Sequence, residues 1–180
     1  MTARAPLPYD FMPPVPSFTL ESTDVAEGQQ MSDAQVFDGF GMTGQNISPQ
    51  LSWRGFPAET KSFAVTCYDP DAPTGSGFWH LVLLDVPVSV TDLATGAVSG
   101  DLPGRPAGAF CVRNDSGVKA FGGAAPPAGE THRYVFAVHA LDVDDLASQG
   151  VDSDVSPAVA GFNLRFHTIA RASLIPVYGH

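Results

Sequence analysis

Short segments in which apolar and polar residues alternate recur along the chain and predict β-strands. Clusters of Gly, Pro and Asp separate these segments, which are FTLES near residue 18, SFAVTCYD (62–69), HLVLLDV (80–86), GAFCVRND (108–115) and HRYVFAVHALD (132–142). Alternation places one face of each strand against a core. Short strands at this spacing favour a mostly β, antiparallel sandwich or barrel.

One late segment has the three- and four-residue spacing of a helix. Ser156 suits an N-cap, Pro157 suits the first turn, and Pro176 ends the segment. The residues predicted to share one face of this helix, which packs against the strands, are Val159, Phe162, Phe166, Ile169 and Ser173. A shorter helical turn is expected within VDDLASQ (143–149).

Length and composition indicate one domain. With 180 residues, 18 Gly and 16 Pro, the chain is long enough for a core and rich in turns. Residues 1–16 read as an extended, Pro-rich N-terminal arm, and residues 17–180 as a single domain. Cys67 and Cys111 lie in apolar segments without a CxxC motif, so both are expected to be buried and reduced.

Charge and hydropathy exclude several functions. A formal net charge of −10 argues against nucleic acid and anionic membranes as partners. No segment has the length of a membrane span, and the N-terminus lacks the apolar core of a signal peptide. The cytoplasm is therefore the expected location, without membrane insertion.

Polar groups end three of the apolar stripes. Asp69 closes the stripe of SFAVTCYD, and His80 begins HLVLLDV on the face of Val82 and Leu84. His132 and Tyr134 precede apolar residues on one face of the last strand, whereas His139 falls on its other face and is expected to be structural. Together these groups predict a pocket at one end of a sheet, apolar below and polar at its mouth.

Each of these residues also has a purely structural interpretation. Asp69 and Asp71 suit turn caps, His80 and His132 suit histidines at the edge of a core, and Tyr134 suits an amphipathic wall. One carboxylate with two imidazoles resembles a metal site, but no HExxH, paired-Cys spacing or nucleophile elbow is present. We therefore expect noncovalent capture of a small charged ligand, with no cofactor, no metal and no catalytic residue.

The segment FGGAAPPAGETHRY (121–134) strengthens the case for a pocket. Gly122 and Gly123 let the backbone bend and expose N–H groups, and Pro126 with Pro127 stiffens the chain after them. Exposed N–H groups beside His132 suit an anion.

Five segments together resemble the phosphatidylethanolamine-binding protein family, and its bacterial branch in particular. They are NISPQLSW (46–53), YDPDAP (68–73), GFWH (77–80), PPAGETHRY (126–134) and FNLRFHTIARASL (162–174), and the likeness spans roughly residues 17–178. The resemblance implies an antiparallel, Greek-key β-sandwich with an anion pocket at one edge. The ligand-binding residues implied by the resemblance are Asp69, His80, His132, Tyr134, Gly123, Ala124 and Ala125. Those expected to support the pocket are Pro70, Asp71, Pro73, Trp79, Pro126, Arg133 and Tyr178, the last as the counterpart of a tyrosine that closes eukaryotic pockets.

The function implied is binding of phosphate or phosphoethanolamine-like head groups. Protonated His80 or His132, the Tyr134 hydroxyl and loop N–H groups would receive phosphate oxygens, while Asp69 orients a histidine or accepts a ligand ammonium. Affinity for an anion should then fall as pH rises past ~6.5, the unperturbed histidine pKa. The alternatives are a module that inhibits a protease or kinase and, with less support, a hydrolase that uses Asp69, His80 and His132. Bacterial relatives suggest a homodimer.

Overall fold

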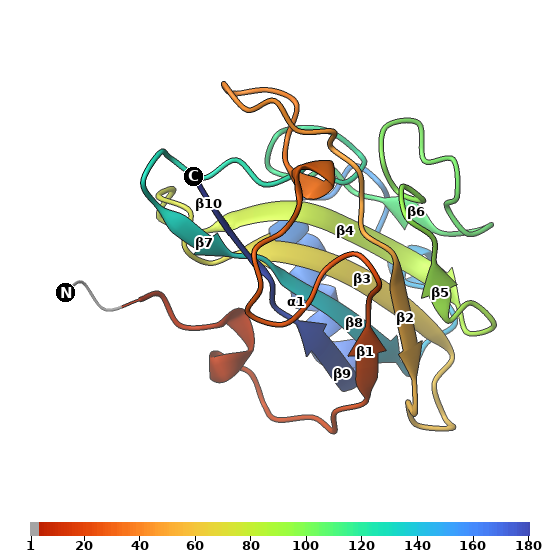
Figure 1. Cartoon of the computed structure of the whole chain (residues 1–180). Helices are drawn as coiled ribbons and strands as arrows, with labels where there is room; N and C mark the ends of the chain where they lie inside the picture. The colour runs from red at the N-terminus through yellow and green to blue at the C-terminus, as the bar shows by residue number, and fades with distance from the viewer. Residues whose placement is uncertain (1–3) are drawn as a thin grey trace.

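The computed structural model, which describes residues 4–180, contains two facing antiparallel sheets and one α-helix behind the larger sheet (Figure 1). The larger sheet has the order β6-β4-β3-β8-β9, with β3 (Ser62–Asp69), β4 (Phe78–Pro87), β6 (Phe110–Cys111), β8 (Val135–Leu141) and β9 (Thr168–Leu174). The smaller sheet contains β1 (Thr19–Glu21), β2 (Leu51–Arg54) and β5 (Asp92–Leu93). A separate ribbon pairs β7 (Thr131–Arg133) with β10 (Val177–Gly179). The predicted antiparallel, mostly β fold with a late helix is confirmed.

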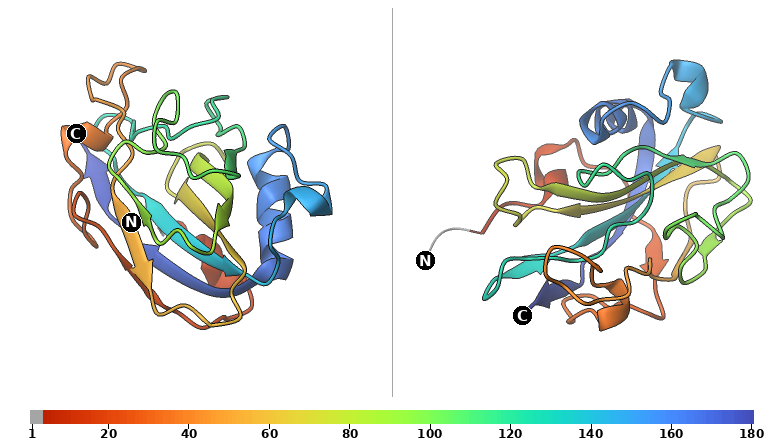
Figure 2. Two further views of the ribbon diagram at one scale, coloured as in Figure 1. Left: turned by 90° about the vertical axis from the view of Figure 1, so that its right-hand side faces the viewer. Right: turned by 90° about the horizontal axis from the view of Figure 1, so that it is seen from above.

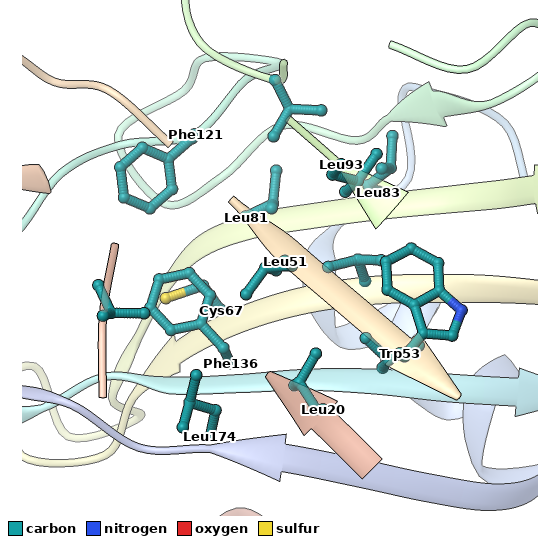
Figure 3. Packing of buried hydrophobic residues seen from close by; sticks show 14 of the residues in the cluster. Leu20, Leu51, Trp53, Cys67, Leu81, Leu83, Leu93, Phe121, Phe136 and Leu174 are labelled. Atoms are coloured by element: carbon teal, nitrogen blue, oxygen red, sulfur yellow. The ribbon is translucent and has the colours of Figure 1, made fainter. Parts of the chain in front are cut away.

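Two layers of apolar residues hold this arrangement together. Between the sheets, Leu20, Leu51 and Trp53 face Cys67 and Phe136 (Figure 3). A second cluster fills the space between the larger sheet and the helix, which lies against the opposite face of that sheet (Figure 2). The larger sheet is therefore buried on both faces, which explains the nearly continuous apolar runs in β3 and β4. Cys67 and Cys111 are buried and free, as predicted.

The helix α1 (Pro157–His167) is shorter than the sequence predicts. Its N-cap is confirmed, because the Ser156 side chain accepts a hydrogen bond from the amide of Val159. The helix ends at His167, however, and the next seven residues form β9. The Thr168 hydroxyl donates to the Leu164 carbonyl at 2.6 Å and helps to end the helix. Pairing of β9 with β8 then gives the backbone sheet hydrogen bonds in place of helical ones.

The buried face of α1 also differs from the predicted one. Pro157, Ala160 and Leu164 pack on the sheet, whereas Phe162 and Phe166 are 64% and 62% exposed. The prediction of the face was wrong because it followed the largest apolar side chains. The face that contacts the sheet carries Ala160 and Leu164 in place of the aromatic residues.

A bulge in β4 places His80 on a face that alternation does not predict. The pairing with β3 skips His80, since the residues on either side of it face consecutive positions of β3. The extra residue reverses the alternation. Val82 and Leu84 consequently pack under the helix, while the His80 ring lies 5.1 Å from the ring of Tyr134 in the core between the sheets. The predicted common face of His80, Val82 and Leu84 is wrong.

The predicted last strand is two strands that separate at Tyr134. The Tyr134 amide donates to the Pro176 carbonyl at 3.0 Å, and β7 leaves the larger sheet to pair with β10. His139, in β8, lies on the opposite face from Tyr134, as predicted, and contacts Tyr9 and Thr168. Within 143–149, the helical turn is limited to the 3₁₀ segment η3 (Ala147–Gln149).

The N-terminal arm, from residue 4 onward, contacts the larger sheet. It contains the 3₁₀ turn η1 (Pro8–Phe11), and another 3₁₀ turn, η2 (Asp33–Gln35), lies between β1 and β2. The Tyr9 hydroxyl lies 3.3 Å from His139 Nε2, and the Arg171 guanidinium stacks 4.0 Å above the Tyr9 ring. Residues 1–3 of the predicted arm lie outside the described residues. The helices within residues 4–180 are too short and too polar to cross a bilayer.

Candidate functional site

A cavity of about 220 Å³ lies where β3 ends and β4 begins. It is walled mainly by apolar side chains, with a few polar groups among them. The lining residues are Phe37, Phe40, Asp69, Ala72, Pro73, Thr74, Phe78, His80, Ser116, Gly122, Gly123, Ala125, Pro127, His132 and Tyr134. Four residues predicted to bind a ligand, Asp69, His80, His132 and Tyr134, therefore line the same cavity.

A buried ion pair joins Asp69 to His132. Asp69 Oδ2 accepts from His132 Nδ1 at 2.7 Å, and both side chains are less than 5% exposed. The other oxygen of Asp69 accepts from the amides of Asp71 and Ala72, at 2.8 and 3.1 Å. Asp69 therefore caps the turn and orients the histidine at once, so the two interpretations of this residue hold together.

The contacts of His132 favour its imidazolium form. Its Nε2 lies 3.0 Å from Glu130 Oε2, so both ring nitrogens face carboxylate oxygens, which only accept hydrogen bonds. Burial lowers the pKa of His132, but the hydrogen bonds and charges of Glu130 and Asp69 outweigh that effect and raise the pKa above its ordinary value.

His80 has the opposite tendency. Its Nδ1 donates to the Gly122 carbonyl at 2.8 Å, an arrangement that leaves Nε2 unprotonated in the neutral ring. Burial lowers the pKa of His80, and the hydrogen bond to Gly122 and the charge of Asp69 oppose the effect only in part. The lowered pKa therefore favours the neutral ring of His80 at pH 7.

The Tyr134 hydroxyl is buried and lacks a hydrogen-bond partner within residues 4–180. Burial and the charge of Asp69 raise the pKa of Tyr134, so the group keeps its proton. A buried hydroxyl without a partner costs about 1–3 kcal/mol. Since this hydroxyl belongs to a lining residue of the cavity, a ligand acceptor can satisfy it.

The Gly-rich loop does not offer the free amides that its sequence predicts. The amide of Gly122 donates to the His80 carbonyl, that of Gly123 to Asn46 Oδ1, and that of Ala124 to the Gln35 carbonyl. The prediction of exposed N–H groups is therefore wrong for Gly122 and Gly123, whose amides bind acceptors on neighbouring segments. Ala125, also predicted to bind the ligand, lines the cavity, and its amide is not among these bonds. Gly123 is required for close packing instead, since a Cβ there would lie 2.5 Å from the Phe37 amide nitrogen.

The residues expected to support the pocket take different places. Asp71 forms a bidentate ion pair with Arg133 and accepts from its backbone amide at 2.9 Å, which fastens the loop between β3 and β4 to β7. Pro73 lines the cavity, and Trp79 packs in the cluster under the helix. Three more of these residues, Pro70, Pro126 and Tyr178, are absent from the cavity wall. Ala124, which was predicted to bind the ligand, is absent as well. Tyr178 lies opposite His132 in the β10–β7 pairing and is buried in the core.

Several residues of the site escape sequence reasoning. Phe37 and Phe40 come from a loop without periodicity and stack with ring centroids 5.3 Å apart. Phe40 is 82% exposed, lines the cavity mouth and has a φ of 55°, in the left-handed region. Glu130 could have been found, because it stands two positions before His132 and shares its side of an extended chain.

Within residues 4–180, no three His, Cys, Asp or Glu side chains are grouped so as to hold a metal ion. The polar groups of the cavity are instead arranged as hydrogen-bond donors and acceptors around an ion pair. Such a set can bind a small polar molecule without covalent chemistry.

Comparisons with known proteins agree with this architecture. A sequence model of the family described as phosphatidylethanolamine-binding protein matches residues 21–179. Protein YbhB of Escherichia coli K12 is 48% identical over 159 residues, which cover 88% of this chain and 98% of YbhB. Protein YbcL of the same organism is 46% identical over 163 residues, covering 90% of this chain and 87% of YbcL.

Solved structures give the same result. The crystal structure of E. coli YbcL, described as a member of the mammalian PEBP family, superposes with a TM-score of 0.87 at 45% identity. The match covers 91% of this chain and 99% of that one. A homologue from Chlamydia trachomatis superposes with a TM-score of 0.74 at 26% identity, covering 91% and 98% of the two chains.

Proposed function

Because the chain belongs to the phosphatidylethanolamine-binding protein family, we propose that its cavity binds a small ligand through a phosphate group, as in phosphate or a phosphoethanolamine-like head group. Membership of the family supports ligand binding in general. The observation that carries the phosphate proposal is the buried, unpartnered Tyr134 hydroxyl in a cavity that also holds the imidazolium of His132.

The donors available to an anion are few and well defined. The Tyr134 hydroxyl donates to one phosphate oxygen, and His132 supplies the positive charge that makes a hydrogen bond to an anion strong. His80 adds a second donor when it is protonated. These donors can bind a phosphate oxygen despite the net charge of −10, because a hydrogen bond acts at contact distance and is strong in the low-dielectric interior of a protein.

Binding rather than catalysis is favoured by the hydroxyls of the cavity. Ser116 Oγ donates to Asn114 Oδ1 at 2.7 Å, and the Thr74 hydroxyl donates to the Gly77 carbonyl. Neither hydroxyl is hydrogen-bonded to a histidine, which is the arrangement that activates a nucleophile.

The test is calorimetric titration with O-phosphoethanolamine of the wild-type protein and of Tyr134→Phe. Loss of one hydrogen bond to a charged group is expected to weaken binding about tenfold or more. Tyr178→Phe is the matched control and should bind as the wild type does, since Tyr178 is absent from the cavity wall. Equal affinities for the wild type and Tyr134→Phe would contradict the proposal.

The pH dependence of binding follows from the two histidines. The raised pKa of His132 keeps its charge above pH ~6.5, so affinity should fall only as pH rises beyond that value. The lowered pKa of His80 means that its donor appears below pH ~6.5 and tightens binding there. A constant affinity between pH ~5.5 and ~8.5 would be inconsistent with imidazolium donors.

A second candidate is contact with a protein, such as a protease or kinase, through the rim of the cavity. The exposed ring of Phe40 favours it, because aromatic side chains are enriched at protein interfaces. Phe40→Ser should then abolish inhibition of a susceptible protease. Inhibition that survives this change would remove Phe40 from the contact.

A further inference from the structure

A carboxylate of the chain itself already occupies the donor that an anion would use on His132. Glu130 immediately precedes β7, and its Oε2 lies 3.0 Å from His132 Nε2. His132 Nδ1 is held by Asp69. Any ligand oxygen that binds to this imidazolium must therefore take the place of one of the two carboxylates.

Of these two, Glu130 is the one that can be displaced. The Asp69 side chain is 4% exposed and is fixed by two backbone amides in addition to His132. The Glu130 side chain is 51% exposed, and its one described hydrogen bond is that to His132 Nε2. Moving an exposed side chain costs little, because water solvates the released carboxylate.

The charges around His132 disfavour a plain anion. Asp69 and Glu130 contribute two negative charges and His132 one positive charge, while His80 is neutral at pH 7. A phosphate monoester competes with Glu130 for Nε2 and is then repelled by the displaced carboxylate nearby. An ammonium group on the same ligand replaces this repulsion with attraction, since the displaced Glu130 carboxylate can pair with the ammonium.

We propose that Glu130 is a specificity-determining residue, a built-in competitor for His132 Nε2 that weakens binding of simple phosphate monoesters and spares those with an adjacent ammonium group. The inference rests on the proposed function, because it assumes that a phosphate group enters this cavity. The inference adds Glu130, which is outside the cavity wall, to the proposed phosphate site. It also predicts that ligands with an ammonium group bind more tightly than those without one.

The experiment compares two probes that differ only in the ammonium group, ethyl phosphate and O-phosphoethanolamine. Calorimetric titrations at pH ~6 and low salt are made with the wild type, Glu130→Gln and Glu130→Ala. The charge control is Glu59→Gln, since Glu59 is an exposed carboxylate in the turn between β2 and β3. This pH lies below the unperturbed histidine pKa of ~6.5, and the ion pair with Asp69 remains in the Glu130 variants to favour protonated His132.

The wild type is expected to prefer O-phosphoethanolamine. Both Glu130 variants should bind ethyl phosphate about five- to tenfold more tightly than the wild type, in line with removal of a nearby like charge. Their affinity for O-phosphoethanolamine should change less than about twofold, so the preference between the probes shrinks. Glu59→Gln should leave both affinities and their ratio unchanged.

Two results would overturn the inference, and they are distinguishable. If ethyl phosphate binds the wild type and both Glu130 variants equally, Glu130 is not a competitor, although the proposed function stands. If neither probe binds any of the proteins, the cavity is not a phosphate site, and both proposals fail together.

Discussion

Three buried histidines of this chain hold their protons differently because their partners differ. His132 lies between two carboxylates, His80 faces a backbone carbonyl, and His139 is surrounded by hydroxyls and the Arg171 guanidinium. Burial, followed by the charge of Arg171, lowers the pKa of His139 to about 3. Burial therefore favours the neutral ring of His139 in β8, whereas two carboxylates favour the charged ring of His132 in β7.

His139 is expected to make the protein sensitive to acid. Its pKa in the folded chain is below that in the unfolded chain, about 6.5, so its contribution to stability is complete above pH ~6.5 and is lost as pH falls toward about 3. Between pH 7 and pH 5 this loss amounts to about 2 kcal/mol.

Urea denaturation of the wild type and His139→Gln at pH 7 and pH 5 measures this effect. The variant should be less stable at pH 7, but it should lose less on acidification, because Gln does not titrate. His132 stabilises with the opposite sign, most below pH ~6.5, and is present in both proteins, so the difference isolates His139. Identical losses in the two proteins would rule out a buried neutral His139.

At the scale of residues, the sequence was enough to predict which polar side chains lie at the cavity, but not which of their neighbours' hydrogen-bonding groups are already occupied. Asp69, His132 and Tyr134 follow from strand ends and alternation, which depend on local spacing alone. The occupied amides of Gly122 and Gly123 depend on Asn46 and on the His80 carbonyl, which only the tertiary fold brings near. Such partners leave no local pattern in the sequence.

Among the elements, α1 shows where periodicity misleads. Its two phenylalanines point to solvent, whereas Ala160 and Leu164 face the sheet, so the buried fraction of each side chain, and not its size, decides what the side chain contributes to stability. Leu164→Ala should lower the free energy of unfolding by about 2–4 kcal/mol, because Leu164 is 4% exposed. Phe162→Ala should change it by about 0.5 kcal/mol or less. Chemical denaturation of the two variants checks the order, and equal losses would place Phe162 in the core.

For the strands, too, local patterns in the sequence predict some bounds and faces correctly and others wrongly. The bounds of β3 were predicted to the residue, because turn signals flank its apolar segment on both sides. In β4 the bulge reversed the faces, and in β8 the pairing of β7 with β10 cut the predicted strand in two. The prediction of α1 failed at its C-terminus because β9 gains hydrogen bonds from β8, a long-range effect that overrides local propensity.

At the scale of the whole molecule, one ion pair connects three distant parts of the chain. Asp71 holds the amide and guanidinium of Arg133, while Arg133 also donates to the Ala5 carbonyl and Arg4 lies 3.4 Å from Asp71. The loop after β3, the strand β7 and the N-terminal arm therefore meet at one point beside the cavity.

Asp71→Asn is expected to loosen all three parts together. Loss of the charge should lower the free energy of unfolding by about 1–2 kcal/mol. In hydrogen–deuterium exchange, residues 4–16 and β7 should exchange faster, while β3 and β4 keep their protection. Acceleration confined to β7 would show that the arm is held independently.

The connection has a consequence for how binding would be detected. A ligand that contacts His132 is expected to stabilise β7 against local opening, and segments that open together gain protection together. Amide exchange around Tyr9 should then slow in proportion to ligand occupancy, although Tyr9 does not line the cavity. Amide exchange in the arm would therefore measure ligand occupancy of the cavity from the opposite face of the sheet.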